Sequence, residues 1–217
     1  MVIVLAVVVL TVGPAFGFTK GLIGGGKNQA ASAVTMDDAV ASQSDLVKSY
    51  SQGVKYNFQT QSTMAAALGL KEEAAKLHTA AESIQEGNVK GIEAAKAETA
   101  GLTEAVDKKV AAGGELSDEA KKKVGQSLVT MCKSLLAYRT AADMSKSTLE
   151  LAQTVIKDAP ITQKMSAKKT LDPVLTIGPK VPGEMANMAS TAKHYIDFAK
   201  SVGVEPPADL NKALGDL

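Results

Sequence analysis

The chain has 217 residues and a formal net charge of +1, with 24 basic and 23 acidic side chains scattered along it. This balance lacks the basic stripe of a nucleic-acid-binding protein, so we expect no nucleic acid among its partners. Tryptophan is absent and aromatic residues make up only 4% of the chain, which favours helices because strands are enriched in aromatic and β-branched residues.

The amino-terminal residues have the pattern of an export signal. The uncharged apolar run Val2–Val12 is interrupted at Gly13 and followed by Ala15–Gly17, which has the small-x-small order of a cleavage site. A membrane-spanning helix needs about 20 apolar residues, and this run is shorter. No basic residue precedes the run, so a retained membrane anchor remains an alternative, and a buried strand is a third. We expect residues 1–17 to direct the protein to the periplasm or cell envelope.

A glycine-rich stretch, GLIGGGKN at Gly21–Asn28, resembles a phosphate-binding P-loop that lacks its last residue. A P-loop requires Ser or Thr where Asn28 stands, and it must follow a strand and open a helix. The sequence provides neither the hydroxyl nor alternating strands and helices. We therefore interpret residues 18–34 as a flexible tether between the targeting segment and the folded domain.

Residues 35–217 read as a single helical-bundle domain in which apolar residues recur at helical spacing. Three long helices are expected, the first from Thr35 to about Leu68, the second from Lys71 to Ala112, and the third from Ser117 to just before Pro160. Thr35 and Ser117 are N-cap residues followed by acidic first turns, as helix starts require.

The third helix has the most regular apolar pattern. Its steps alternate between four and three residues, which predicts coiled-coil packing with a left-handed supercoil. The predicted seam consists of Val124, Leu128, Met131, Leu135, Tyr138, Ala142, Ser145, Leu149, Ala152 and Ile156.

The carboxyl-terminal third contains several prolines and is predicted to be irregular. We expect a shorter helix within about Ile161–Ile177 that is kinked or restarted at Asp172-Pro173, a turn over Gly178–Pro182, a helix over Gly183–Val202, and a short helix at Ala208–Leu214. Together these elements predict an all-α fold, an elongated antiparallel up-down bundle with three long helices and a broken fourth layer.

Two residues inside the predicted helices have uncertain roles. Cys132 lies among apolar residues and is interpreted as a packed hydrophobe, with an intermolecular disulfide or a reactive thiol as the alternatives. Asn88 falls on the seam of the second helix between Gly87 and Gly91. It is either a buried residue that fixes the helix register or an exposed one, if the seam slips at the glycines. We expect a kink or a close helix crossing there.

No pattern indicates catalytic, cofactor-binding or metal-binding residues. His78 and His194 flank seam positions, no haem-attachment motif is present, and neither histidine belongs to an inward-facing E-x-x-H pair. The macrodipole explains the paired carboxylates at the predicted helix starts. These pairs are Asp37-Asp38, Glu72-Glu73 and Asp118-Glu119.

The sequence therefore predicts no enzyme and no cofactor. We expect an exported structural or protein-interaction module of the cell envelope, with a protein partner or self-association through helical faces and a possible membrane tether through residues 1–17. The alternative is a periplasmic carrier of a hydrophobic ligand or haem. It rests on the irregular carboxyl-terminal third, which could open a groove against the long helices.

Overall fold

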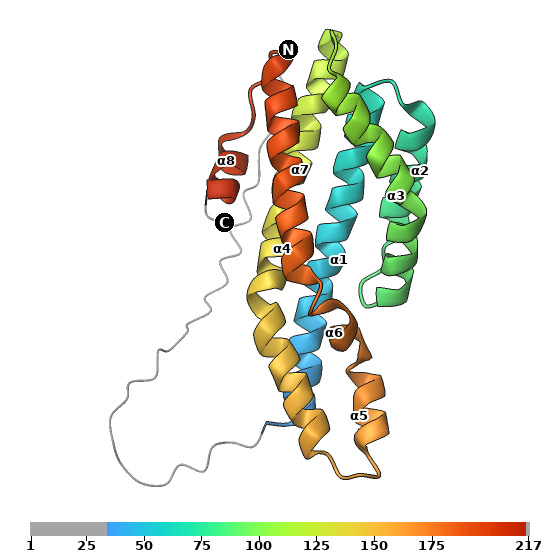
Figure 1. Cartoon of the computed structure of the whole chain (residues 1–217), viewed down its shortest axis with the longest axis vertical. Helices are drawn as coiled ribbons and strands as arrows, with labels where there is room; N and C mark the ends of the chain where they lie inside the picture. Colours follow the sequence, from blue (N-terminus) through green and yellow to red (C-terminus); the bar gives the residue numbers. More distant parts are fainter. Residues whose placement is uncertain (1–33, 216–217) are drawn as a thin grey trace, which may run out of the picture. The chain divides into compact units, whose positions relative to one another are not determined.

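The computed structural model describes residues 34–215, and every regular element in this range is a helix, which confirms the all-α class (Figure 1). The predicted targeting segment, most of the tether and the glycine-rich stretch lie outside the described residues. The helices are α1 (Met36–Ala67), α2 (Lys71–Ser83), α3 (Val89–Ala112), α4 (Asp118–Asp158), α5 (Lys164–Thr170), α6 (Asp172–Ile177), α7 (Val181–Ser201) and α8 (Ala208–Gly215).

The two longest helices, α1 and α4, pack along each other and run antiparallel. The Ser42 and Thr148 hydroxyls hydrogen bond at 2.8 Å near one end of the pair. Further along, the Ser134 hydroxyl donates to the Gly53 carbonyl at 2.8 Å. Both helices begin at the predicted caps, because the side chains of Thr35 and Ser117 each accept a hydrogen bond from a first-turn amide.

The buried face of α4 departs from the predicted seam beyond Tyr138. Val124, Leu128, Met131 and Leu135 are buried as expected. In the second half, Ala142, Leu149 and Ile156 are only partly buried. Ser145 and Ala152 are buried as predicted, and the other buried positions are Ala141, Thr148 and Val155. Two three-residue steps therefore follow each other at Leu135, Tyr138 and Ala141, and alternate seam positions lie one residue earlier than predicted while the seven-residue repeat continues.

The predicted second long helix, Lys71–Ala112, is wrong as a single element. The structure ends α2 at Ser83 and begins α3 at Val89. Gly87 adopts a left-handed φ of 87°, and the Asn88 side chain accepts a hydrogen bond from the Gly91 amide at 3.0 Å. Asn88 is therefore an exposed N-cap and not a buried residue that fixes register.

The carboxyl-terminal third follows the predicted pattern with one correction. The chain restarts at Pro173, which occupies the first turn of α6. The helix expected from Gly183 begins at Val181, because Pro182 fits the first turn, where no amide donor is needed. Figure 1 shows α7 lying along α4 and α2 lying beside α1, and α3 packs against α2, α1 and α7.

Candidate functional site

A polar network centred on Tyr50 joins α1 to α3 and α7. The Tyr50 hydroxyl lies 3.1 Å from carboxylate oxygens of both Glu93 and Glu184. Lys96 Nζ donates to that hydroxyl at 3.0 Å and also forms an ion pair with Glu184. A hydroxyl has one proton, so Tyr50 donates to one carboxylate at a time. The same hydroxyl oxygen accepts the hydrogen bond from Lys96.

Two further side chains extend the network. On α4, the ring of Tyr138 meets that of Tyr50 edge to face, with centroids 6.0 Å apart and an interplanar angle of 83°. Lys180, at the start of α7, forms an ion pair with Glu93 on α3. Four helices therefore meet at one set of hydrogen bonds and ring contacts.

The protonation states of the side chains in the network are set by burial and by the neighbouring charges. Burial, followed by the nearby charge of Glu184, raises the pKa of both Tyr50 and Tyr138, so both hydroxyls stay protonated as donors. Burial opposes ionisation of Glu93, but the hydrogen bond from Lys180 and the charge of Lys96 lower its pKa overall. No buried side-chain nitrogen or oxygen among residues 34–215 lacks a hydrogen-bond partner. The network's polar groups are thus engaged in joining helices.

A second polar cluster lies between the end of α3 and α7. The buried Tyr195 hydroxyl donates to the Asp107 carboxylate at 3.3 Å, beside a cavity of about 380 Å³ that His194 also lines. Loss of water around the Asp107 carboxyl raises its pKa, although the Tyr195 hydrogen bond and the His194 charge oppose this shift.

An apolar groove of about 470 Å³ separates α4 from α8. Val129 and Leu136 stand two helical turns apart at the groove and are 49% and 50% exposed. Lys133 lies between them on α4, and Asp209 and Lys212 face them from α8. We call this feature the α4–α8 groove. It combines solvent-facing apolar side chains with a polar rim, which is the composition of a recognition surface.

Cys132 lies in the same groove and is buried, as the sequence predicts. Burial and the nearby Asp209 carboxylate both raise the pKa of its thiol, which disfavours the reactive thiolate.

The histidines and the paired carboxylates of the sequence lie at the surface or at helix starts. His78 and His194 are both exposed, and no group of three metal-ligating side chains is present within residues 34–215. The paired carboxylates occupy the first turns of α1, α2 and α4, where they complement the helix dipole.

Sequence reasoning missed both the groove and the network. Val129 and Leu136 each follow a seam residue, Leu128 and Leu135, so a second apolar stripe seven residues apart was visible in the sequence. The network carried no such signal, because Tyr50 and Glu184 lie 134 residues apart in the chain.

Comparison of the chain with models of protein families, with curated proteins and with solved structures found no match. Among the residues that the structure describes, no helix combines the length and apolar character needed to cross a bilayer.

Proposed function

We propose that the protein is an exported, non-enzymatic helical-bundle module of the cell envelope that binds a protein partner through the α4–α8 groove. The observation that carries this proposal is the pair of half-exposed apolar side chains, Val129 and Leu136, on a groove rim. Export is expected from residues 1–17. In this proposal the helices form an antiparallel up-down bundle that acts as a rigid support for the groove.

The groove is suited to an amphipathic helix. Residues seven apart on α4 stand roughly 10 Å from each other along the helix axis. A partner helix with apolar residues at i, i+3 or i+4, and i+7 would match that spacing. Lys133 and Lys212 at the rim favour acidic residues beside the partner's apolar face.

Affinity capture with a matched pair of variants tests this proposal. The tagged full chain is used to capture proteins from envelope extracts of its own source, alongside Leu136→Asp and Gln153→Asp. Gln153 is exposed on the same helix, so both variants add one negative charge to α4. We expect a partner retained by the wild type and by Gln153→Asp but lost from Leu136→Asp. An identical set of proteins from all three chains would contradict the proposal.

Self-association is a further outcome of the same experiment. If the groove binds a second copy of the chain, light scattering will report a mass of about twice 22.4 kDa for the wild type, and Leu136→Asp will be monomeric.

The alternative function is that of a carrier for a hydrophobic ligand or haem. The volume of the α4–α8 groove supports this alternative. Ligand cavities typically enclose about 300–1,000 Å³ with mostly apolar lining, and the α4–α8 groove lies within that range. Native mass spectrometry and a visible spectrum of protein from its own source distinguish the two functions. A colourless species at the mass of the bare chain would exclude the carrier.

A further inference from the structure

The turn between α4 and α5 and the first turn of α5 each present one strongly exposed apolar side chain. Ile161 is 88% exposed and Met165 is 80% exposed. They lie four positions apart in the chain, and the Lys164 amide donates to the Pro160 carbonyl, so this turn is already helix-like. Water-exposed apolar side chains of this size lose favourable burial energy unless something covers them.

Basic residues surround this apolar pair. Lys157 lies in the last turn of α4, Lys164 begins α5, and Lys168 and Lys169 lie in the last turn of α5. All four are exposed, and none of them has an ion-pair partner among residues 34–215. Between positions 157 and 169 the only acidic residue is Asp158. We call residues 157–169 the basic tip.

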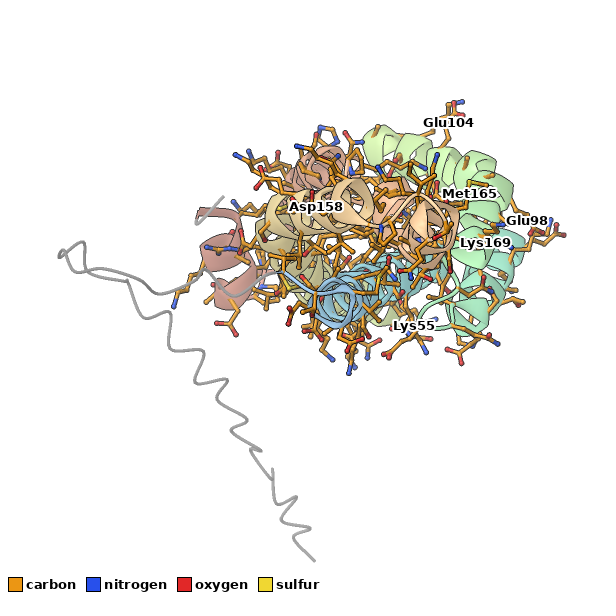
Figure 2. The ribbon with its side chains drawn as sticks, turned by 90° about the horizontal axis from the view of Figure 1, so that it is seen from below. Lys55, Glu98, Glu104, Asp158, Met165 and Lys169 are labelled. Carbon is orange, nitrogen blue, oxygen red and sulfur yellow. The ribbon has the colours of Figure 1, made fainter. Side chains whose placement is uncertain are left out.

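The basic tip projects from the end of the helix bundle. Only Ala167 of α5 is buried, so little of this helix is used for packing. Figure 2 views the molecule from this end, with Asp158 on α4 and Met165 and Lys169 on α5 labelled. Because α1 and α4 are antiparallel, Thr35 at the start of α1 lies at the same end (Figure 1). The amino-terminal segment is therefore joined to the bundle at the end that carries the basic tip.

We propose that the basic tip docks onto the surface of an anionic phospholipid membrane. Ile161 and Met165 enter the boundary between head groups and acyl chains, and the four lysines contact lipid phosphates. This division of roles is how interfacial helices combine apolar burial with attraction to anionic lipids. The carboxylates nearest to the tip in the chain are Asp158 and Asp172, and Asp37 and Asp38 lie in the first turn of α1. Asp38 is engaged in hydrogen bonds with Thr35.

The absence of tryptophan allows a direct test. In the full chain, Met165→Trp places a single fluorescent reporter at the basic tip, and Gln126→Trp places one at an exposed site near the other end of α4. Each chain is titrated with vesicles of phosphatidylcholine alone or with added phosphatidylglycerol. We expect a blue shift and quenching by brominated lipids for Met165→Trp with the anionic vesicles only, and neither change for Gln126→Trp.

Removal of lysines tests the electrostatic part in the Met165→Trp background. Each lysine near an anionic surface contributes roughly a fivefold gain in affinity, so Lys164→Gln, Lys168→Gln and Lys169→Gln together should weaken binding about 100-fold. If the amino-terminal segment also binds the vesicle, the chain stays on the lipid after the three lysines are removed. Removal of the lysines will then reduce the size of the blue shift at position 165 and not the apparent affinity. The matched control, Lys121→Gln with Lys122→Gln and Lys123→Gln, removes the same charge at the start of α4 and should leave the tip signal unchanged.

Three outcomes would overturn the proposal. One is a folded Met165→Trp chain, judged by circular dichroism, that shows no shift with anionic vesicles at low salt. Another is an equal shift with both vesicle types that does not depend on the lysines. The third is a concentration-dependent shift without lipid, which would assign the tip to contacts between copies of the chain. Variants of the α4–α8 groove should not alter the lipid signal, so failure of this proposal and failure of the proposed function are distinguishable.

Discussion

Gly53 of α1 shows how a single small residue sets the distance between the two longest helices. A Cβ atom at this position would lie 3.0 Å from Cδ2 of the Tyr138 ring, and that ring is only 3% exposed. The Ser134 hydroxyl, one turn away on α4, donates to the Gly53 carbonyl. Because Gly53 has no side chain, α1 and α4 can approach each other closely. The absent side chain leaves room for the Tyr138 ring, and the close approach brings the Ser134 hydroxyl within hydrogen-bond distance of the Gly53 carbonyl.

Gly53→Ala is expected to destabilise the protein by up to about 2 kcal/mol. Overpacking a buried contact costs roughly 1–3 kcal/mol, which outweighs the gain of about 1 kcal/mol in helix propensity. The control is Gly101→Ala in α3, where an added Cβ meets no atom within 4 Å and where we expect stabilisation of about 0.5–1 kcal/mol. Urea unfolding of both variants measures the difference. Stabilisation of similar size in both would contradict the close approach.

Glu93 is expected to make stability fall in acid. Its pKa is lowered from the ordinary 4.5 in the folded chain, so folding favours the ionised form. This contribution is present above pH 4.5 and is lost as the pH falls through the lowered pKa.

Glu93→Gln removes this pH dependence, because its side chain cannot ionise. We expect a loss of no more than about 1 kcal/mol at pH 7, since the site is partly exposed, and a shallower decline in melting temperature below pH 4.5. Glu98→Gln is the control on the same helix, where the side chain points away from the bundle (Figure 2). If Glu93→Gln and the wild type lose stability in parallel between pH 5 and pH 3, the network does not hold Glu93 ionised.

At the scale of elements, the break between α2 and α3 interrupts the helix without interrupting the spacing of the apolar residues. Ile84 is buried although its backbone is extended, and Ile92 is buried on α3. Apolar residues thus continue at helical spacing across a stretch that is not helical. Periodicity alone cannot detect such a break, and the information lies in Gly87 with its left-handed φ and in Asn88 as the cap.

Asn88→Ala is expected to lower the free energy of unfolding by about 1 kcal/mol, because the Gly91 amide loses its acceptor. Amide hydrogen exchange in the first turn of α3 should accelerate. Asn88→Asp retains a side-chain acceptor and should stay close to the wild type in both measurements. Equal losses in the two variants would show that the cap is not the cause.

Most other helix boundaries could be predicted from the sequence, because short-range chemistry determines them. Thr35 and Ser117 cap their helices, and Gly69 and Gly113 adopt positive φ values where helices end. The candidate site was less accessible. The burial of Cys132 followed from its apolar neighbours, whereas the groove depends on α8 folding back onto α4. That contact joins segments about 80 residues apart, and no local rule predicts it.

At the scale of the whole described bundle, three features have separate roles in this account. The Tyr50 network joins four helices and provides a rigid support. The α4–α8 groove offers an apolar recognition surface on one side, and the basic tip lies at the end where the amino-terminal segment joins. If both proposals hold, the protein is placed at a membrane surface by its tip while the groove remains open to a partner.

Site-specific photocrosslinking in cells of the protein's own source tests the central claim, partner binding at the α4–α8 groove, most directly. The tagged full chain carries Leu136→p-benzoylphenylalanine, with Gln153→p-benzoylphenylalanine as the control on the same helix. We predict one discrete adduct for the groove position that the control position lacks. Absence of an adduct at position 136, or the same adducts at both positions, would contradict the account.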